Sequence, residues 1–103
     1  MNRKDSLIKL LEASPNDLFL NYALAMEFVS EGQLEMAIER LEWIRQFDAT
    51  YLATYYQLAA LYQNYDKEKA IEIYHLGIAL ARSQGNQKTA LELNSALEQF
   101  EFE

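Results

Sequence analysis

The residue types that could support catalysis or bind a metal are sparse in this sequence and poorly placed for either. His75 is the only histidine, and the chain has no cysteine. A metal site at His75 would need carboxylates from elsewhere, because neither a second histidine nor a thiolate accompanies it. We expect His75 to be a solvated residue on a helix surface, and we predict no metal site and no cofactor.

Carboxylates are numerous, and a pair of them could act as general acid and base. Glu35, Glu39 and Glu42 lie along one exterior stripe of a helical pattern, in which Arg40 and Arg45 are interspersed. Ion pairs on a helix surface explain this arrangement better than acid–base chemistry does. No phosphate-binding loop or nucleophile motif is present. The sequence therefore predicts no catalytic residue and a protein that is not an enzyme.

Composition narrows the classes of partner. The chain has 103 residues, enough for one domain, and half of them are apolar, which argues against disorder. Nine basic residues against sixteen acidic ones give a net charge of −7, whereas nucleic-acid binding requires clustered lysine and arginine. No run approaches the ~18 apolar residues of a membrane span, and no signal peptide is evident. We therefore expect a cytoplasmic protein with neither nucleic acid nor membrane as partner.

An internal sequence repeat with a period of 34 residues, which we call the 34-residue echo, marks the helices that carry the remaining candidate site residues. The offset falls to 33 residues in the second half of the copy, where one residue is missing. Self-similarity at this period is typical of helix–turn–helix repeats, which bury their apolar faces only against neighbours. The matching pairs are Ser14 with Asp48, Tyr22 with Tyr56, Leu24-Ala25 with Leu58-Ala59, Phe28 with Tyr62, and Ala37-Ile38-Glu39 with Ala70-Ile71-Glu72.

Apolar side chains recur at helical spacing through both copies, as in the stripe of Leu20, Leu24 and Phe28. Ser14-Pro15 predicts a capping hydroxyl before a proline at the first helical position, and Asp48 is the expected cap of the equivalent helix. Glycines stand where we expect turns. The predicted helices span residues 4–13, 15–30, 33–46, 49–64, 67–84 and 87–100.

The repeated segment, in which Ala37-Ile38-Glu39 recurs as Ala70-Ile71-Glu72, resembles the repeat of the tetratricopeptide repeat family. The resemblance implies an all-α fold, a right-handed α-solenoid of antiparallel helix pairs with about six helices. It also implies a single domain over residues 1–103. The expected divisions are a half-repeat over 1–14, repeats over 14–47 and 48–82, and a capping helix over 86–100.

Three residues depart from the family's pattern. Asn21 and Glu27 stand where the family usually buries a large and a small apolar residue, and Gly77 replaces an alanine or larger residue. A truncated first unit would leave the face of helix 15–30 partly uncovered, which we expect to accommodate Asn21.

The resemblance further implies a concave groove lined by the first helix of each unit. Tyr22 and Tyr56 repeat on this surface, and aromatic side chains with methionine suit an apolar or extended peptide. The alternative is that both tyrosines mainly pack between helices. The predicted groove residues are Phe19, Tyr22, Met26, Val29, Ala53, Tyr56, Gln57, Ala60 and Gln63, joined by Leu91, Asn94, Ser95 and Glu98 of the last helix.

Some members of the family grip the C-terminal carboxylate of a peptide with lysine, arginine and asparagine. Tyr22, Met26 and Gln57 occupy the matching positions here. Without a cation, a buried carboxylate would lose its hydration uncompensated. We therefore expect a largely neutral and apolar groove without a carboxylate clamp.

Trp43 lies on the second helix of the first repeat, where the family usually has an outward polar residue. An exposed tryptophan is a good anchor for self-association, whereas the alternative is packing against Phe47 with the ring edge exposed. The sequence favours a non-catalytic scaffold that binds a peptide or protein segment in the groove. The alternative is a self-associating assembly subunit, a homo-oligomer that uses Trp43 and the exposed terminal helix faces.

Overall fold

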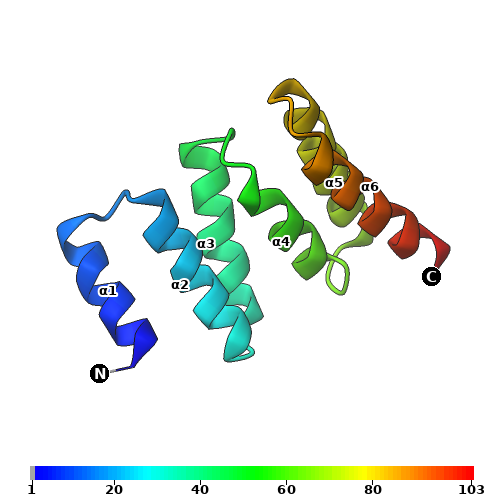
Figure 1. Ribbon diagram of the computed structural model, residues 1–103. Helices are drawn as coiled ribbons and strands as arrows, with labels where there is room; N and C mark the ends of the chain where they lie inside the picture. The colour runs from blue at the N-terminus through cyan, green and yellow to red at the C-terminus, as the bar shows by residue number, and fades with distance from the viewer. Residues whose placement is uncertain (1) are drawn as a thin grey trace. The chain divides into compact units, whose positions relative to one another are not determined.

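The computed structural model describes residues 2–103, which form six α-helices and no strand, as predicted. The chain divides into two compact units, Met1–Tyr51 and Leu52–Glu103, which we describe separately. Each unit contains three helices (Figure 1). The helices are α1 Arg3–Ala13, α2 Leu18–Ser30, α3 Leu34–Phe47, α4 Ala53–Tyr62, α5 Lys67–Ser83 and α6 Gln87–Phe102.

In the first unit, α2 packs against both α1 and α3 (Figure 1). Leu24 and Phe28 of the predicted stripe are buried in α2, and Leu41 of α3 is fully buried. Ala37 also has no exposed surface, so α2 and α3 approach closely at this position. Burial of these stripes is the main force that holds the three helices together, because hydrophobic stabilisation grows with the apolar area removed from water.

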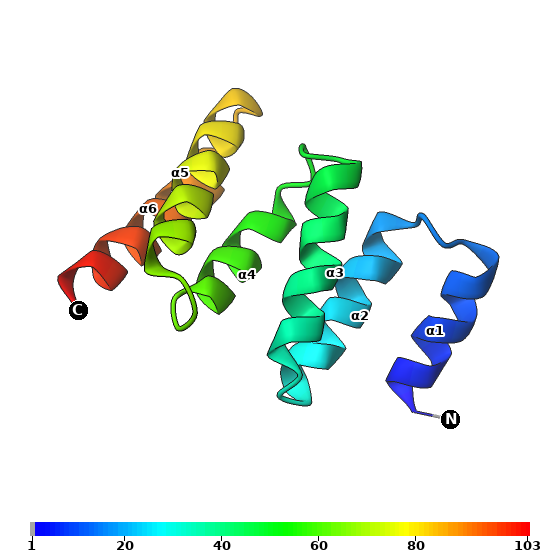
Figure 2. The same ribbon diagram turned by 180° about the vertical axis from the view of Figure 1, so that it is seen from behind.

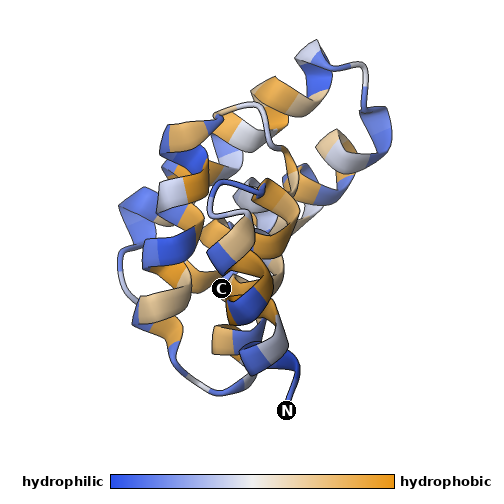
Figure 3. Cartoon of the chain, turned by 90° about the vertical axis from the view of Figure 1, so that its left-hand side faces the viewer, coloured by the Kyte–Doolittle hydropathy of each residue, from blue (hydrophilic) through white to orange (hydrophobic). Residues whose placement is uncertain are grey.

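In the second unit, α5 packs against both α4 and α6 (Figure 2). Gly77 lies where these helices meet: a Cβ atom there would be 2.8 Å from Cβ of Tyr55 and 3.1 Å from Cδ1 of Leu93. The space that the family's pattern gives to a larger residue is thus taken by Tyr55 and Leu93. Along each helix, hydrophobic and hydrophilic residues alternate with the turns of the ribbon (Figure 3).

Two glycines end helices as the sequence predicted. Gly32 and Gly85 have φ angles of 76° and 72°, which side-chain-bearing residues rarely adopt. After α2, the N–H of Gln33 donates to the carbonyl of Phe28 at 2.8 Å, and Asn86 makes the corresponding bond after α5. This is the hydrogen-bond pattern of a Schellman motif, which satisfies the last carbonyls of a helix.

The predicted start of α2 is wrong. The helix begins at Leu18, and its N-cap is Asp17, whose carboxylate accepts a hydrogen bond of 2.9 Å from the N–H of Leu20. Ser14 instead ends α1, because its N–H donates to the carbonyl of Leu10. Pro15 therefore lies in the turn between the two helices and not at the first helical position.

The start of α4 is also later than predicted, at Ala53 instead of residue 49. Asp48 does not cap this helix, since its carboxylate accepts hydrogen bonds from the N–H and the hydroxyl of Thr50, at 2.9 and 2.6 Å. The two bonds favour the ionised form and lower the pKa of Asp48. Such a side-chain turn competes with helix formation, so the helix starts beyond it.

Candidate functional site

A buried polar network positions the start of α2. Asn21 has no exposed surface, and its side-chain nitrogen donates to the carbonyls of Pro15 and Asp17, at 3.0 and 2.8 Å. Its side-chain oxygen accepts a 2.8 Å hydrogen bond from Nη1 of Arg40. Asn21 is therefore accommodated by hydrogen bonds in a covered site, and not by the uncovered helix face that the sequence led us to expect.

Glu27, the second departure from the family's pattern, forms an ion pair across α1 and α2. Its carboxylate lies 2.6 Å from Nε of Arg3. Lys4 and Glu31 form a second pair of the same kind at 3.1 Å. Ion pairs near the surface contribute little to stability, but these two link Glu27 of α2 and its C-cap residue Glu31 to the basic start of α1.

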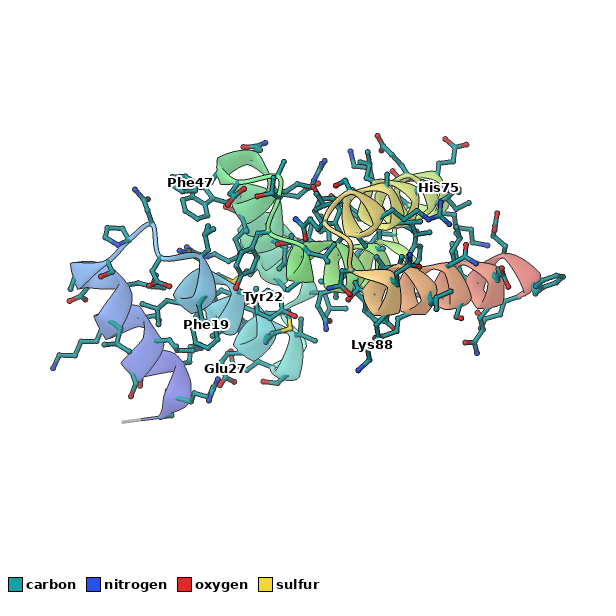
Figure 4. All side chains as sticks on the ribbon, turned by 45° about the horizontal axis from the view of Figure 1, so that its top comes forward. Phe19, Tyr22, Glu27, Phe47, His75 and Lys88 are labelled. Atoms are coloured by element: carbon teal, nitrogen blue, oxygen red, sulfur yellow. The ribbon has the colours of Figure 1, made fainter. Side chains whose placement is uncertain are left out.

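The predicted residues of the first repeat lie on α2, where Phe19 and Tyr22 can be followed in Figure 4. Phe19 is 65% exposed, and Tyr22, Met26 and Val29 are half-buried. The ring of Tyr22 also packs against Tyr51, with centroids 6.2 Å apart and a tilt of 56°. Tyr22 thus combines packing against another aromatic ring with a partly accessible surface.

In the second unit, the predicted residues Ala53, Tyr56, Gln57 and Ala60 lie on α4, and Gln63 is its C-cap residue. Tyr56 is 41% exposed, and Gln57, Ala60 and Gln63 are half-buried. The side-chain nitrogen of Gln63 donates a 2.7 Å hydrogen bond to the phenolic oxygen of Tyr74, which is buried in α5. Gln63 therefore joins the exposed face of α4 to the core of this unit.

A cleft runs along α6 in the second unit, opposite α4 and, at one end, opposite the turn after α4 and the start of α5, and we call it the α4–α6 cleft. Three adjoining hollows form it, with volumes of about 380, 260 and 500 Å³. The central hollow adjoins the other two, because it shares Tyr56 with the first and Phe100 with the third. Besides these two rings, its principal lining residues are Ala60, Gln63, Ala96 and Gln99.

The α6 side of this cleft was only partly predicted. Leu91 and Ser95 line it as expected, but Gln99 continues the line at the same helical spacing and was missed. Asn94 donates a 2.8 Å hydrogen bond to Glu98, and neither is among the residues that line the hollows. The spacing of Leu91 and Ser95 was the signal that could have identified Gln99.

Tyr74 forms part of the floor of the cleft. Burial raises the pKa of its phenol, because the charged phenolate would be poorly hydrated there. The hydrogen bond from Gln63 opposes this rise, and the nearby phenol of Tyr56 adds to it. The floor of the cleft therefore favours the neutral phenol of Tyr74.

Trp43 stacks on Phe47, with ring centroids 5.0 Å apart and planes inclined by 18°. Trp43 is half-buried, whereas Phe47 is 53% exposed (Figure 4). The structure thus contains the packing that was the alternative to a freely exposed tryptophan. Trp43 also borders a shallow hollow with Phe28, Met36 and Arg40.

The polar residues that were weighed for catalysis or metal binding do not form one cluster. His75 is exposed on α5 (Figure 4), and Glu42 forms an ion pair of 2.7 Å with Arg45. Within residues 2–103, no group of three histidine, cysteine, aspartate or glutamate side chains is placed to hold a metal ion. None of the helices in this range is long and apolar enough to cross a membrane.

Two solved structures of a tetratricopeptide repeat domain protein from Salinibacter ruber resemble this chain. The solution structure is 38% identical over 84% of this chain and 89% of the other, with a TM-score of 0.79. The crystal structure is 37% identical over 82% and 97%, with a TM-score of 0.77. Comparisons with models of known families and with curated proteins gave no match.

A protein of Bordetella parapertussis shares the fold. Its solution structure has a TM-score of 0.84 over 97% of this chain and 88% of the other, at 24% identity. The helical repeat predicted from the 34-residue echo is thereby confirmed as an architecture that other proteins also adopt.

Proposed function

Because this chain belongs to the tetratricopeptide repeat family, we propose that it is a non-catalytic scaffold that binds a protein or peptide segment with the exposed faces of α2 and α4. Repeats of this family are interaction modules, and binding of proteins or peptides is their usual role. The proposed contact residues are Phe19, Tyr22, Met26 and Val29 on α2, and Tyr56, Gln57, Ala60 and Gln63 on α4.

The observation that carries this proposal is the exposure of aromatic side chains at matching positions of the two repeats. Tyr22 is half-buried and Tyr56 is 41% exposed, and the more exposed ring of Phe19 lies near Tyr22 on α2. Partly exposed tyrosines offer a large apolar area with a polar tip, which is typical of residues that dominate binding energy. Rings that are held in place by packing, as Tyr22 is by Tyr51, lose little entropy on binding.

The chemistry of these faces supports a neutral or apolar contact. Met26 and Gln57 are half-buried and carry no charge, so neither can pair with the terminal carboxylate of a peptide. The partner segment is therefore proposed to bind through internal residues and not through its C-terminus.

Selection from a phage-displayed library of random twelve-residue peptides tests the proposal, followed by measurement of Kd for a selected peptide by fluorescence anisotropy. Truncation of a hot-spot aromatic costs about 2 kcal/mol or more, roughly 30-fold in Kd. The variant Tyr22→Ala/Tyr56→Ala should therefore bind at least that much more weakly. Trp43→Ala is the matched aromatic control and should keep its affinity. Retention of the peptide by the double variant, with loss by Trp43→Ala, would contradict the proposal.

A second candidate function is self-association through α3, which the apolar surface around Trp43 favours. Phe47 is 53% exposed and Met36 is 49% exposed on the same helix. Apolar side chains gathered on one helix often mark an interface. Sedimentation across a concentration series tests this candidate: the native chain should form dimers or larger assemblies that Trp43→Ala reduces. A monomer at all concentrations rejects it.

A further inference from the structure

The α4–α6 cleft combines an aromatic floor with an excess of negative charge at its edge. The charged residues that line its hollows are Glu92, Glu101, Glu103 and Lys67. Three carboxylates and one ammonium group thus line the cleft, which leaves an excess of negative charge. The whole chain has the same sign, with a net charge of −7. Charges of one sign that are gathered around a hollow attract an ion of opposite sign more strongly than isolated surface charges do.

Lys67 does not neutralise this edge. It is exposed at the first residue of α5 and lines only the hollow that also contains Glu101 and Glu103. At the other end of the cleft, Glu92 borders the hollow beside Tyr56 with no cation among the lining residues. Both ends of the cleft therefore favour a cation over an anion.

The centre of the cleft is mainly polar, which suits peptide groups, and its rings offer a place for an apolar side chain. Tyr56 and Phe100 supply rings, and Ala60 and Ala96 leave space between α4 and α6. The hydrogen bond to Tyr74 holds the carboxamide of Gln63 at the floor, with its oxygen available as an acceptor for a peptide N–H.

We propose that the α4–α6 cleft binds a basic peptide segment, in which an aliphatic or aromatic side chain lies within a few residues of lysine or arginine. The apolar side chain packs on Tyr56 and Phe100, and the cation lies beside Glu101 and Glu103 or beside Glu92. This inference rests on the proposed function, because it assigns the chemistry of a segment bound by the α4 face. Acidic peptides are disfavoured by the same carboxylates.

The composition of the peptides selected from the random library is the first readout. Selected sequences should contain more lysine and arginine than the input library and should be depleted in aspartate and glutamate. A selected peptide in which glutamine replaces each lysine and arginine should bind at least about fivefold more weakly. Binding of the original peptide should weaken between 50 and 300 mM NaCl, because salt screens exposed charges over about 10 Å or less.

Variants that remove single carboxylates or pairs of them then test whether the glutamates of the cleft cause the preference for basic peptides. Glu101→Gln/Glu103→Gln or Glu92→Gln should reduce the affinity for the basic peptide and its salt dependence, with little change for the glutamine peptide. The matched control is Glu12→Gln/Glu35→Gln, which removes two exposed carboxylates from the first unit. This control should change the affinity by less than about twofold.

The outcomes separate this inference from the proposed function. Neutral or acidic peptides whose binding depends on Tyr22 and Tyr56 would overturn the basic-segment proposal and leave the proposed function standing. A basic peptide whose affinity falls equally in the cleft variants and in the control would also overturn it. If no peptide is enriched above an uncoated surface, both proposals fail.

Discussion

Arg40 of α3 donates a 2.8 Å hydrogen bond to the side-chain oxygen of Asn21, which is fully buried in α2. The same amide donates to two carbonyls of the turn that precedes α2. One side chain thus ties together the turn, α2 and α3. It also fixes the first turn of the helix that carries Phe19 and Tyr22.

Asn21→Ala should lower the free energy of unfolding by about 1–3 kcal/mol, because it removes the partner of the half-buried Arg40 donor and of the Pro15 carbonyl. Urea denaturation followed by circular dichroism measures this change. Asn64→Ala is the control, since Asn64 is exposed and should tolerate the same truncation within about 0.5 kcal/mol. Equal effects of the two variants would show that the buried network does not stabilise the fold.

Gly77→Ala should destabilise the second unit, although alanine is normally better than glycine inside a helix by about 1 kcal/mol. The added Cβ would meet Cβ of Tyr55, which cannot move without the backbone of α4. Overpacking of this kind costs about 1–3 kcal/mol. The melting midpoint should therefore fall.

Ala79→Gly provides the opposite test on the exposed face of α5, where only helix propensity changes. It should destabilise by about 0.5–1 kcal/mol. A rise in the melting midpoint for Gly77→Ala would show that α4 and α6 do not approach α5 as closely as the structure indicates.

Leucine in place of Ala37 or Ala70 should destabilise by about 1–3 kcal/mol. Both alanines have no exposed surface, Ala37 in α3 and Ala70 in α5. A larger side chain at either position must push the paired helices apart. Thermal melts of the two variants check this expectation, and an unchanged midpoint for both would place the alanines away from the helix contacts.

Tyr74 should make stability depend on pH in the alkaline range. Its pKa in the folded chain is raised above the ordinary value of 10.0 by burial. The folded state then holds the phenolic proton more tightly than the unfolded state does. The contribution of the protonated Tyr74 phenol to the stability of the fold is therefore fully present below pH 10, and it is lost as the pH rises through the raised pKa.

Tyr74→Phe removes this titration and should flatten the decline in the melting midpoint above pH 10, relative to the native chain. Tyr65→Phe is the control, because Tyr65 is 53% exposed. An equal decline for the native chain and for Tyr74→Phe would show that the buried phenol does not titrate differently in the two states.

The repeat fold could be predicted because the 34-residue echo combines with helical spacing of apolar residues. The start of α2 could not, because Ser14 and Asp17 are both good caps and lie three residues apart. The N–H of Ser14 completes α1, which leaves Asp17 to start α2. Local sequence offers both choices, and only the packed helices decide between them.

The candidate site could be predicted only in part for a related reason. Tyr22 and Tyr56 repeat in sequence, so their helix face could be identified from the echo. Gln99 lies in α6, which has no copy at the 34-residue offset, and the bond between Gln63 and Tyr74 joins residues of different helices. The helical spacing of Leu91 and Ser95 points to Gln99, but the bond between Gln63 and Tyr74 depends on how the helices pack and leaves no periodic trace.

The most direct test of the central claim is an NMR titration of the 15N-labelled chain with a selected peptide. We predict that the largest chemical-shift changes occur at the amides of Phe19, Tyr22, Tyr56 and Gln63, on α2 and α4. The indole N–H of Trp43 should change little. If the largest changes instead occur at Trp43 and along α3, with α2 and α4 unaffected, the proposed binding faces are wrong.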